Sequence, residues 1–530
     1  MCRNTFPKEC QLLPWVGQPS VYHYIKEQID QYGKIVKDTL PDEDSSNEEI
    51  LFAPGAIDGM LEHHGMRTEE DDARIKKLVK CIRQQVTNPG NKTRRATYLA
   101  VMDDKILGYI DVLLKEIRIQ SDLNPDWLYQ EAIWFIQNSA HREVVKLGIA
   151  LLGLFQCEDD LDLLFTIGRH DEFTLYVSVA IQNGTADPDL HLFQLVQLVD
   201  GWGKIHIVER LQPETQEIRD WLLRKGCRNS IMDEYLAYTC AEKGKLHMAL
   251  KAEKIDTDLY HGAGIIISAL INGGWAAEDI DDYLHAYSVL SDYLRHSRIQ
   301  CKTATDLNVI VEIKRFLEQE EEQWRERYEQ GWTPEQREEL VSEVRSFLAD
   351  EKWEIVILRE LQSEQCNLHA AVQVAEELSL DIWFDLLGRL KKDLLNEDIY
   401  HVLIRTTDLD RIRHLVRLVE ETLPLDQITT GPALEGGTFG EKVHKYKLHC
   451  CIETIVQGLN RFAGTGIPLI RASLQSPVIR NRTVALNTLK AWEVSEWVQE
   501  CSHLVANLAQ SDPDEDVRLS ARKLLKRVSQ

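Results

Sequence analysis

The stretch SDPDEDVRLSARKLLKRV, residues 511–528, decides how the rest of the chain is interpreted. It begins with an acidic turn that contains a proline, and an arginine then precedes small and leucine residues at helical spacing. An upstream stretch, SPVIRNRTVALNTLKAW at 476–492, aligns with it at an offset of 36 residues. That offset is typical of helical repeats. The alignment superposes three pairs of residues: Arg482 with Arg518, Ala485 with Ala521, and Leu489 with Leu525.

Each copy follows a short amphipathic segment, IPLIRASLQ or SHLVANLAQ, so the predicted unit is helix, tight turn with proline, helix. One helix pair cannot bury its apolar stripe alone, and neighbouring pairs therefore stack around a shared core. The small residue at Ala485 or Ala521 allows close approach of the next helix. We expect Arg518 to reach back to its acidic turn, which is a structural role. The segment HREVVKLGIALLGLF repeats the pattern through Val144, Gly148 and Leu152 but lacks the arginine.

The Asp512–Pro513 turn, the Val517–Arg518 pair and the spacing of Ala521 and Leu525 resemble HEAT repeats. The resemblance is clearest at 468–528. The middle of the chain, LVDGWGKIHIVERL and WLLRKGCRNSIMDEYLAY, is similar to bacterial HEAT-like proteins of unclear function. The resemblance implies an all-α fold: an α-solenoid of stacked antiparallel helix pairs in a right-handed superhelix. It implies a curved, partner-binding surface and no chemistry.

Several helices can be predicted individually. We expect helices at 21–40 and around 104–119, a single long charged helix at 306–330, and an inner helix at 141–156 that is apolar nearly all round. Thr333, Pro334 and Gln336 form a helix N-terminus signature. The predicted organisation has five segments: an N-terminal extension with an acidic loop (1–68), a helical array (69–330), its continuation after a soft boundary (331–428), a glycine-containing loop that is a linker or a site (429–447), and C-terminal repeats (448–530).

The composition is strongly acidic, with 61 Lys and Arg against 86 Asp and Glu and a net charge of −25. Nucleic-acid binders usually show a basic surface, so this charge argues against that role and fits a solvated surface or a basic partner. The 11 cysteines include no CxxC pair and suggest free thiols in a reducing compartment. We find no secretory signal and no apolar stretch long enough to span a bilayer, and so predict a cytoplasmic protein.

A search for chemistry finds no phosphate-binding loop, nucleophile elbow or HExxH motif, so we assign no catalytic residue, no cofactor and no metal. His141–Arg142–Glu143 has the spacing of a facial iron triad, but its position at a helix start favours a capping or surface role. In GAIDGMLEHHG, Asp58 and Glu62 share a helical face and could bind a metal with His63 or His64. An exposed polar helix end is the simpler interpretation.

The segment GWGKIHIVERL and the two tyrosines that follow it are rich in the aromatic and charged residues that interfaces favour. One interpretation is a partner-binding set; the other is interior packing with a buried polar network, in which Glu209 pairs with Lys204 or Arg210. The set contains Trp202, Lys204, His206, Glu209, Arg210, Tyr235 and Tyr238.

The function expected first is a protein-binding scaffold, one version being an immunity or inhibitor-type protein whose acidic concave surface covers a basic toxin such as a nuclease. A repeat scaffold for larger assemblies is a third class of function. The alternative class is an enzyme: an oxygenase without a visible motif, or an activity like that of the HEAT-like alkylpurine DNA glycosylases. A glycosylase pocket could use Trp202, Trp221, Tyr235, Asp220 and Glu234.

Overall fold

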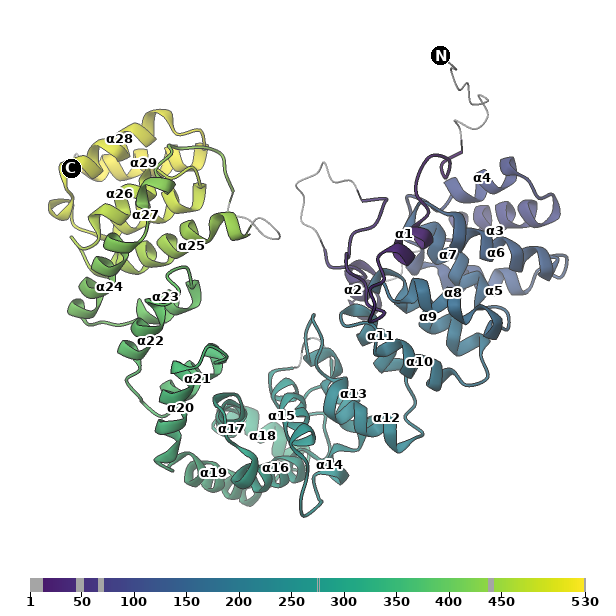
Figure 1. The fold of residues 1–530 in the computed structure, drawn as a ribbon, viewed down its shortest axis with the longest axis horizontal. Coiled ribbons are helices and arrows are strands. Elements are labelled where there is room, and N and C mark those ends of the chain that lie inside the picture. The colour runs from purple at the N-terminus through teal and green to yellow at the C-terminus, as the bar shows by residue number, and fades with distance from the viewer. Residues whose placement is uncertain are drawn as a thin grey trace. The chain divides into compact units, whose positions relative to one another are not determined.

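The computed structural model describes residues 13–43, 52–64, 71–436 apart from Gly274 and Ala276, and 443–528. Helices account for the regular structure of these residues, which contain no strand (Figure 1). Two isolated bridges, Ile29 with Ile35 and Glu435 with Val478, are the only β-type pairings recorded among them. The predicted all-α class is therefore confirmed.

The chain divides into two compact units. Unit 1 comprises residues 1–301 and 312–347, and unit 2 comprises 302–311 and 348–530, so the division passes through α17 (Ala304–Leu317). The helices of unit 1 are α1 (Val21–Glu27), α2 (Ala56–His64), α3 (Asp71–Thr87), α4 (Asn91–Leu99), η2 (Ile106–Gly108), α5 (Ile110–Arg118), α6 (Pro125–Asn138), α7 (Arg142–Leu152), η3 (Glu158–Asp160), α8 (Leu161–Gly168), α9 (Asp171–Gly184), α10 (Pro188–Val196), α11 (Trp202–Arg210), α12 (Gln216–Trp221), η4 (Leu222–Gly226), α13 (Glu234–Gly244), α14 (Leu246–Ala249), α15 (Thr257–Asn272), α16 (Ala286–Gln300), α18 (Glu321–Glu329) and α19 (Pro334–Leu348).

Unit 2 continues with α20 (Lys352–Gln362), α21 (Leu368–Glu377), α22 (Trp383–Leu390), α23 (Glu397–Leu403), α24 (Leu409–Thr422), η5 (Leu425–Ile428), α25 (Val443–Gly458), η6 (Leu459–Arg461), α26 (Ile467–Leu474), α27 (Ile479–Ala491), η7 (Val494–Glu496), α28 (Gln499–Ser511) and α29 (Glu515–Val528).

The core of unit 1 follows a run of helices that each contact the next one. α6 packs on α7, α7 on α9, α9 on α11, α11 on α13, and α13 on α15. As predicted, α7 is buried nearly all round. At Gly148 of α7, a Cβ atom would lie 2.9 Å from the carbonyl oxygen of Ala132 in α6, so this position requires a residue without a side chain.

The C-terminal helices place the two aligned arginines, Arg482 and Arg518, in similar surroundings. α26 contacts α27 and α28, while α27 contacts α29 and α29 contacts α28. The guanidinium of Arg482 donates to the carbonyl oxygens of Ser476 and Pro477 at 2.8 and 3.0 Å. Arg518 donates to the carbonyls of Asp512 and Pro513, 36 residues further on, at 2.5 and 3.1 Å. The two arginines therefore make the same contacts in the same register.

Arg482 also joins the start of α27 to the turn before α29. Its Nε and Nη2 atoms donate to the carboxylate of Asp512 at 2.7 and 2.9 Å, and both side chains are fully buried. Its Nη2 donates to the carbonyl oxygen of Ala433 as well, at 2.9 Å, which holds the described part of the 429–447 loop against α27. Residues 437–442 of that loop lie outside the described residues. Ala485, Leu489 and Ala521 are buried, whereas Leu525 in the last helix is half-buried.

Three predicted helices differ from the observed ones. The helix expected at 21–40 ends at Glu27, and the one expected around 104–119 divides into η2 and α5. The expected helix at 306–330 is wrong, because the chain turns between α17 and α18. That turn folds Trp324 back onto Phe316, with 5.6 Å between the ring centroids, and leaves the indole fully buried.

The cap predicted for α19 is confirmed. Thr333 Oγ1 accepts from the backbone N–H of Gln336 at 3.2 Å, and the Gln336 side chain accepts from the backbone N–H of Thr333 at 3.0 Å. This reciprocal pair satisfies two of the amide groups that a helix start leaves without partners.

Candidate functional site

Two stretches that the sequence analysis treated separately, GAIDGMLEHH and GWGKIHIVER, lie against each other as α2 and α11. Gly59 in α2 faces the indole of Trp202, where a Cβ atom would lie 2.2 Å from the ring. No larger residue fits there without displacement of the buried Trp202. The glycine therefore sets the distance between the two helices and brings Asp58 and Glu62 of α2 close to the other helices of unit 1.

The start of α11 is held by Asp171, the first residue of α9. Cβ atoms added at Gly201 and Gly203 would lie 2.4 and 2.6 Å from its carboxylate oxygens, so both glycines are needed for this approach. Burial raises the pKa of Asp171 to about 7, although the backbone N–H of Gly203 opposes the shift. A carboxyl group at a helix N-terminus is favourably placed, and it fixes α9 to α11.

Beneath α2 lies a buried group of charges that we call the Lys146 cluster: Asp58, Glu143, Lys146 and Glu172. The Nζ atom of Lys146 lies 2.6 Å from Asp58, 2.7 Å from Glu172 and 3.1 Å from Glu143. Burial would lower the pKa of Lys146, but the carboxylates outweigh it and raise the pKa above the usual value. Lys146 therefore stays protonated at neutral pH and cannot act as a nucleophile or base there.

Glu172 is stabilised in its charged form by two neighbouring cations. Burial would raise its pKa, but the charges of Lys146 and Arg142 lower it to about 2. Arg142 also binds Asp42 at 2.9 Å and Glu43 at 3.0 Å, so it ties the N-terminal segment to the cluster. The capping or surface role expected for His141–Arg142–Glu143 is wrong for Glu143, which is 2 % exposed and belongs to the cluster.

A second polar group, which we call the Glu62 group, consists of Glu62, His206 and Glu209. One ligand-type atom from each of the three side chains lies within 4.8 Å of the others. His206 Nδ1 is 2.8 Å from Glu62 Oε2, and the same Glu62 also pairs with Arg210. Glu209 lies 3.3 Å from His63 Nε2.

The two carboxylates of the Glu62 group differ in their electrostatic environment. Burial would raise the pKa of Glu62, but contact with His206 and the charge of Arg210 lower it to about 2. Burial raises the pKa of Glu209 to about 7, and the charge of Glu62 adds to that shift. Burial also lowers the pKa of His206, so this imidazole is neutral at pH 7.

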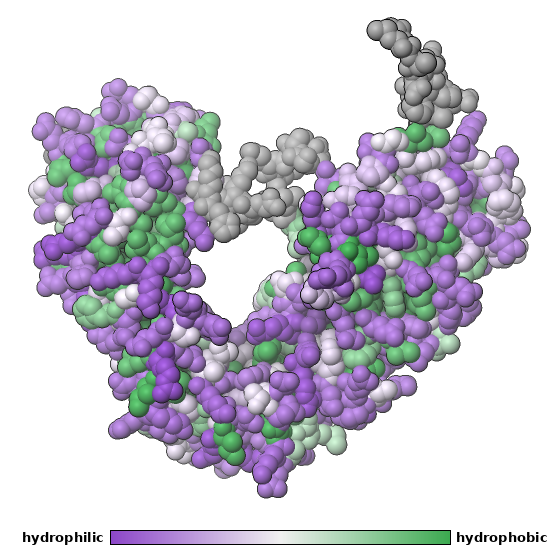
Figure 2. All heavy atoms as spheres, viewed as in Figure 1, coloured by the Kyte–Doolittle hydropathy of each residue, from purple (hydrophilic) through white to green (hydrophobic). Residues whose placement is uncertain are grey.

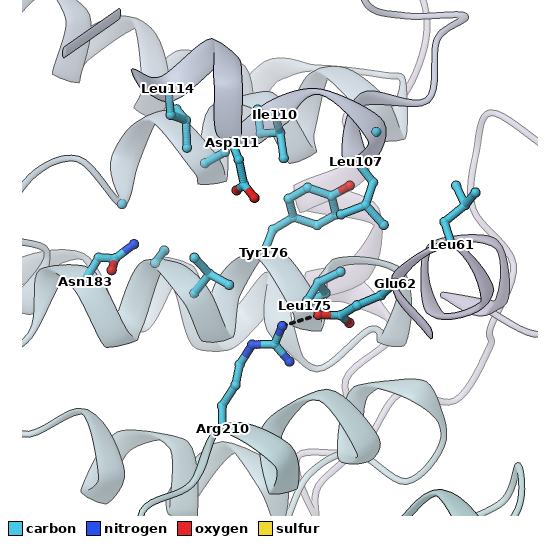
Figure 3. Close-up of a pocket in the computed structure, with 15 residues that line it drawn as sticks. Leu61, Glu62, Leu107, Ile110, Asp111, Leu114, Leu175, Tyr176, Asn183 and Arg210 are labelled. Atoms are coloured by element: carbon cyan, nitrogen blue, oxygen red, sulfur yellow. Dashed lines mark hydrogen bonds and ion pairs between the residues drawn. The ribbon is translucent and has the colours of Figure 1, made fainter. Parts of the chain in front are cut away.

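A pocket of about 410 Å³ opens beside the pair formed by Glu62 and Arg210 (Figure 3). Tyr176 of α9 extends across it, and Asp111 of α5 faces it from the opposite side. Apolar side chains from α2, η2, α5 and α9 make up much of the remaining lining: Leu61, Leu107, Ile110, Leu114, Leu175 and Val179. A mostly apolar pocket with a few convergent polar groups is the usual form of a small-molecule site.

Most of the predicted partner-binding residues are buried in the core of unit 1. Trp202, Lys204, His206 and Tyr235 are buried, whereas the other three, Glu209, Arg210 and Tyr238, are half-buried. Glu209 lies 3.8 Å from Arg210, as one alternative expected, whereas Lys204 donates to backbone carbonyls of residues 225 and 228. Only the half-buried residues offer surface to a partner in this conformation.

The two candidate metal ligands in α2, Asp58 and Glu62, contact different groups. Asp58 turns to Lys146, while Glu62 joins His206 and Glu209 of α11. The side chain of His64 lies outside the described residues. The residues considered for a glycosylase pocket do not converge on the pocket of Figure 3: Trp202 packs on Tyr235 with 5.1 Å between the ring centroids, and Trp221 packs on Phe193 at 5.7 Å.

Sequence reasoning missed the Lys146 cluster, although a signal was present. Glu143 and Lys146 are charged residues within the first turns of a helix that is apolar nearly all round after Arg142, and a buried charge needs a partner of opposite sign. The contributions of Asp111 and Tyr176 to the pocket had no comparable signal, because they depend on how α5 and α9 pack.

Comparison of the chain with protein-family models, curated proteins and solved structures finds no match. None of the described helices has the length and apolar character needed to cross a membrane.

Proposed function

We propose that this chain is a helical-repeat binding protein of the HEAT-like α-solenoid type, with a basic protein as its partner. The observation that supports the repeat is the shared geometry of Arg482 and Arg518, which bind equivalent carbonyls 36 residues apart. Stacked helix pairs of this kind expose extended surfaces, and such proteins commonly act by binding. An immunity or inhibitor-type role is the specific version we favour.

The acidic charge supplies the chemistry of recognition. With a net charge of −25, the chain attracts a basic partner over a distance set by the ionic strength. The segment around α18 and α19 is the densest described source of this charge, with the exposed carboxylates Glu320, Glu321, Glu322, Glu326, Glu329, Glu335, Glu338 and Glu339. On the face drawn in Figure 2, hydrophilic residues predominate and hydrophobic ones are interspersed among them. We place the partner on this acidic segment.

The test is capture of a partner by the tagged chain at about 0.1 M and about 1 M salt, where the Debye length falls from about 10 Å to about 3 Å. The test variant carries Glu322→Lys, Glu326→Lys and Glu329→Lys. A matched control carries three charge reversals at exposed positions of unit 2: Glu364→Lys, Asp398→Lys and Glu421→Lys.

We expect the wild-type and control chains to capture a basic protein in stoichiometric amount at low salt. The basic protein should be lost at high salt, and the test variant should not capture it. A partner held equally by all three chains at both salt concentrations would contradict the proposal, as would the absence of any stoichiometric partner.

The pocket supports a second candidate, an enzyme or receptor for a small molecule on the same helical scaffold. Its volume of about 410 Å³ lies within the range of about 300–1,000 Å³ that small-molecule sites occupy. The variant Val179→Phe narrows the pocket at a partly exposed position. If the pocket is a binding site, compounds that raise the melting temperature of the wild-type chain in a small-molecule screen will not raise that of the variant. A screen without such compounds would reject this candidate.

A further inference from the structure

The Glu62 group brings together three side chains of types that can bind a metal ion. α2 supplies Glu62, and α11 supplies His206 and Glu209, which are three residues apart and therefore on one face of the helix. A zinc ion at about 2.0–2.2 Å from each ligand atom holds those atoms roughly 3–4 Å apart. The three ligand-type atoms lie within 4.8 Å of one another, so small rotations of side chains would bring them onto a single ion.

His206 provides a second and independent observation. Its side chain is fully buried, and neither ring nitrogen has a hydrogen-bond partner among the described residues. Nδ1 faces the carboxylate of Glu62, at 2.8 Å from Oε2, and it is therefore the ring nitrogen directed at the group. Buried polar atoms in native proteins are almost always satisfied. An ion between the imidazole and the carboxylates would satisfy the nitrogen that faces them.

The access route from solvent agrees with this assignment. The carboxylates are near two cations: the guanidinium of Arg210, which pairs with Glu62 and lies 3.8 Å from Glu209, and the ammonium of Lys243, which donates to the backbone carbonyl of Glu209. The side chains of Glu62 and Glu209 are 29 % and 24 % exposed, so an ion can reach them from solvent. Glu62 also lines the pocket of Figure 3.

We propose that Glu62, His206 and Glu209 bind one divalent transition-metal ion of the Zn²⁺ class, which clamps α2 onto α11. Imidazole together with carboxylates suits Zn²⁺ and its first-row neighbours better than Mg²⁺ or Ca²⁺, which prefer all-oxygen sites. Three protein ligands leave at least one coordination position open towards water or a ligand. His63, 3.3 Å from Glu209, would position that carboxylate. This inference does not depend on the proposed protein partner.

The test uses the full chain, freed of metal by chelation and dialysis, and titrates it with Zn²⁺, Co²⁺ or Mg²⁺ alone by calorimetry. We expect one saturable Zn²⁺ per chain and a higher melting temperature, with little effect of Mg²⁺. Glu62→Gln and Glu209→Gln should each weaken Zn²⁺ binding by at least about tenfold. Loss of a residue that only supports a metal ligand already weakens binding by about 10–100-fold, and loss of a ligand should cost no less. Because both positions are partly exposed, both variants should fold.

The matched control is His401→Gln, which removes a histidine that lies 3.5 Å from Glu397 in an exposed pair of unit 2. This change should leave Zn²⁺ affinity unaltered. Cysteines can bind the same ions, and a cysteine ligand would give the Co²⁺ complex a thiolate charge-transfer band. We expect d–d absorption without that band. The proposal would be overturned by any of three results: no saturable Zn²⁺ binding, a Zn²⁺ affinity of Glu62→Gln and Glu209→Gln equal to that of the wild-type chain, or a thiolate band.

Discussion

At the scale of single residues, the Lys146 cluster shows how unit 1 tolerates charges in its core. Lys146 is 1 % exposed and lies within 3.1 Å of three carboxylates, so each charge depends on the others. Removal of one partner from a buried ion pair leaves an uncompensated charge in a medium of low dielectric. The surface pair of Arg413 and Asp410, whose side chains are 61 % and 90 % exposed, lacks this dependence because water screens it.

We therefore predict that Lys146→Met destabilises the protein by about 3–5 kcal/mol, the usual cost of breaking a buried pair. Arg413→Met, the matched surface control, should cost less than about 1 kcal/mol. The measurement is the free energy of unfolding in urea, followed by circular dichroism. Equal losses in the two variants would show that the cluster is solvated.

The same cluster predicts a dependence on pH. The pKa of Glu172 falls from 4.5 to about 2 on folding, so its contribution is complete above pH 4.5 and is lost as the pH falls towards 2. At 1.36 kcal/mol per unit, this contribution is about 3 kcal/mol. In Glu172→Gln, the loss of stability relative to wild type should be largest at pH 7 and should shrink between pH 4.5 and pH 2. A difference that is constant over this range would contradict the assignment.

At the scale of elements, the repeat offers a comparison between two equivalent arginines. Arg482 and Arg518 lie 36 residues apart and donate to equivalent backbone carbonyls, but among the described residues only Arg482 has a buried carboxylate partner, Asp512. We predict that Arg482→Ala costs about 3–5 kcal/mol and Arg518→Ala about 1 kcal/mol, since the second loses only partly exposed bonds to backbone carbonyls.

The control for this comparison is Asp512→Asn, which keeps the size of the side chain but removes the charge that Arg482 faces. Combining Asp512→Asn with Arg482→Ala should cost less than the sum of the single changes, because the two residues share one interaction. Chemical denaturation of the four chains measures the coupling, and additive losses would argue against a bridge between the repeat copies.

The elements also show why prediction from the sequence succeeded in some regions and failed in others. The cap at Thr333 and the apolar periphery of α7 are local features, and local rules predicted them. The break between α17 and α18 depends on Trp324 packing against Phe316, a contact that periodicity does not encode. The Glu62 group also depends on a contact between elements that the sequence pattern does not encode. Its residues lie on two helices whose distance is set by Gly59 and Trp202.

At the scale of the whole molecule, the two compact units carry different features. Unit 1 contains the Lys146 cluster, the Glu62 group and the pocket, whereas unit 2 contains the buried pair of Arg482 and Asp512. Lys146 and Arg482 share no partner among the described residues. Substitutions without shared partners usually add within about 0.3–0.5 kcal/mol.

This division predicts how the full chain unfolds. Lys146→Met should lower the stability of unit 1 and Arg482→Ala that of unit 2, so the double variant should lose the sum of the two free energies. Unfolding of each unit can be followed by the fluorescence of one tryptophan, Trp202 in unit 1 or Trp492 in unit 2, after the other tryptophans have been replaced. Hydrogen exchange in α11 and in α27, which ends next to Trp492, gives the same information for the unaltered set of tryptophans. We expect exchange in α11 to respond to Lys146→Met but not to Arg482→Ala, and exchange in α27 to respond in the opposite way. If each substitution accelerated exchange equally in both helices, the units would form one cooperative structure, and the two-unit description would not extend to stability.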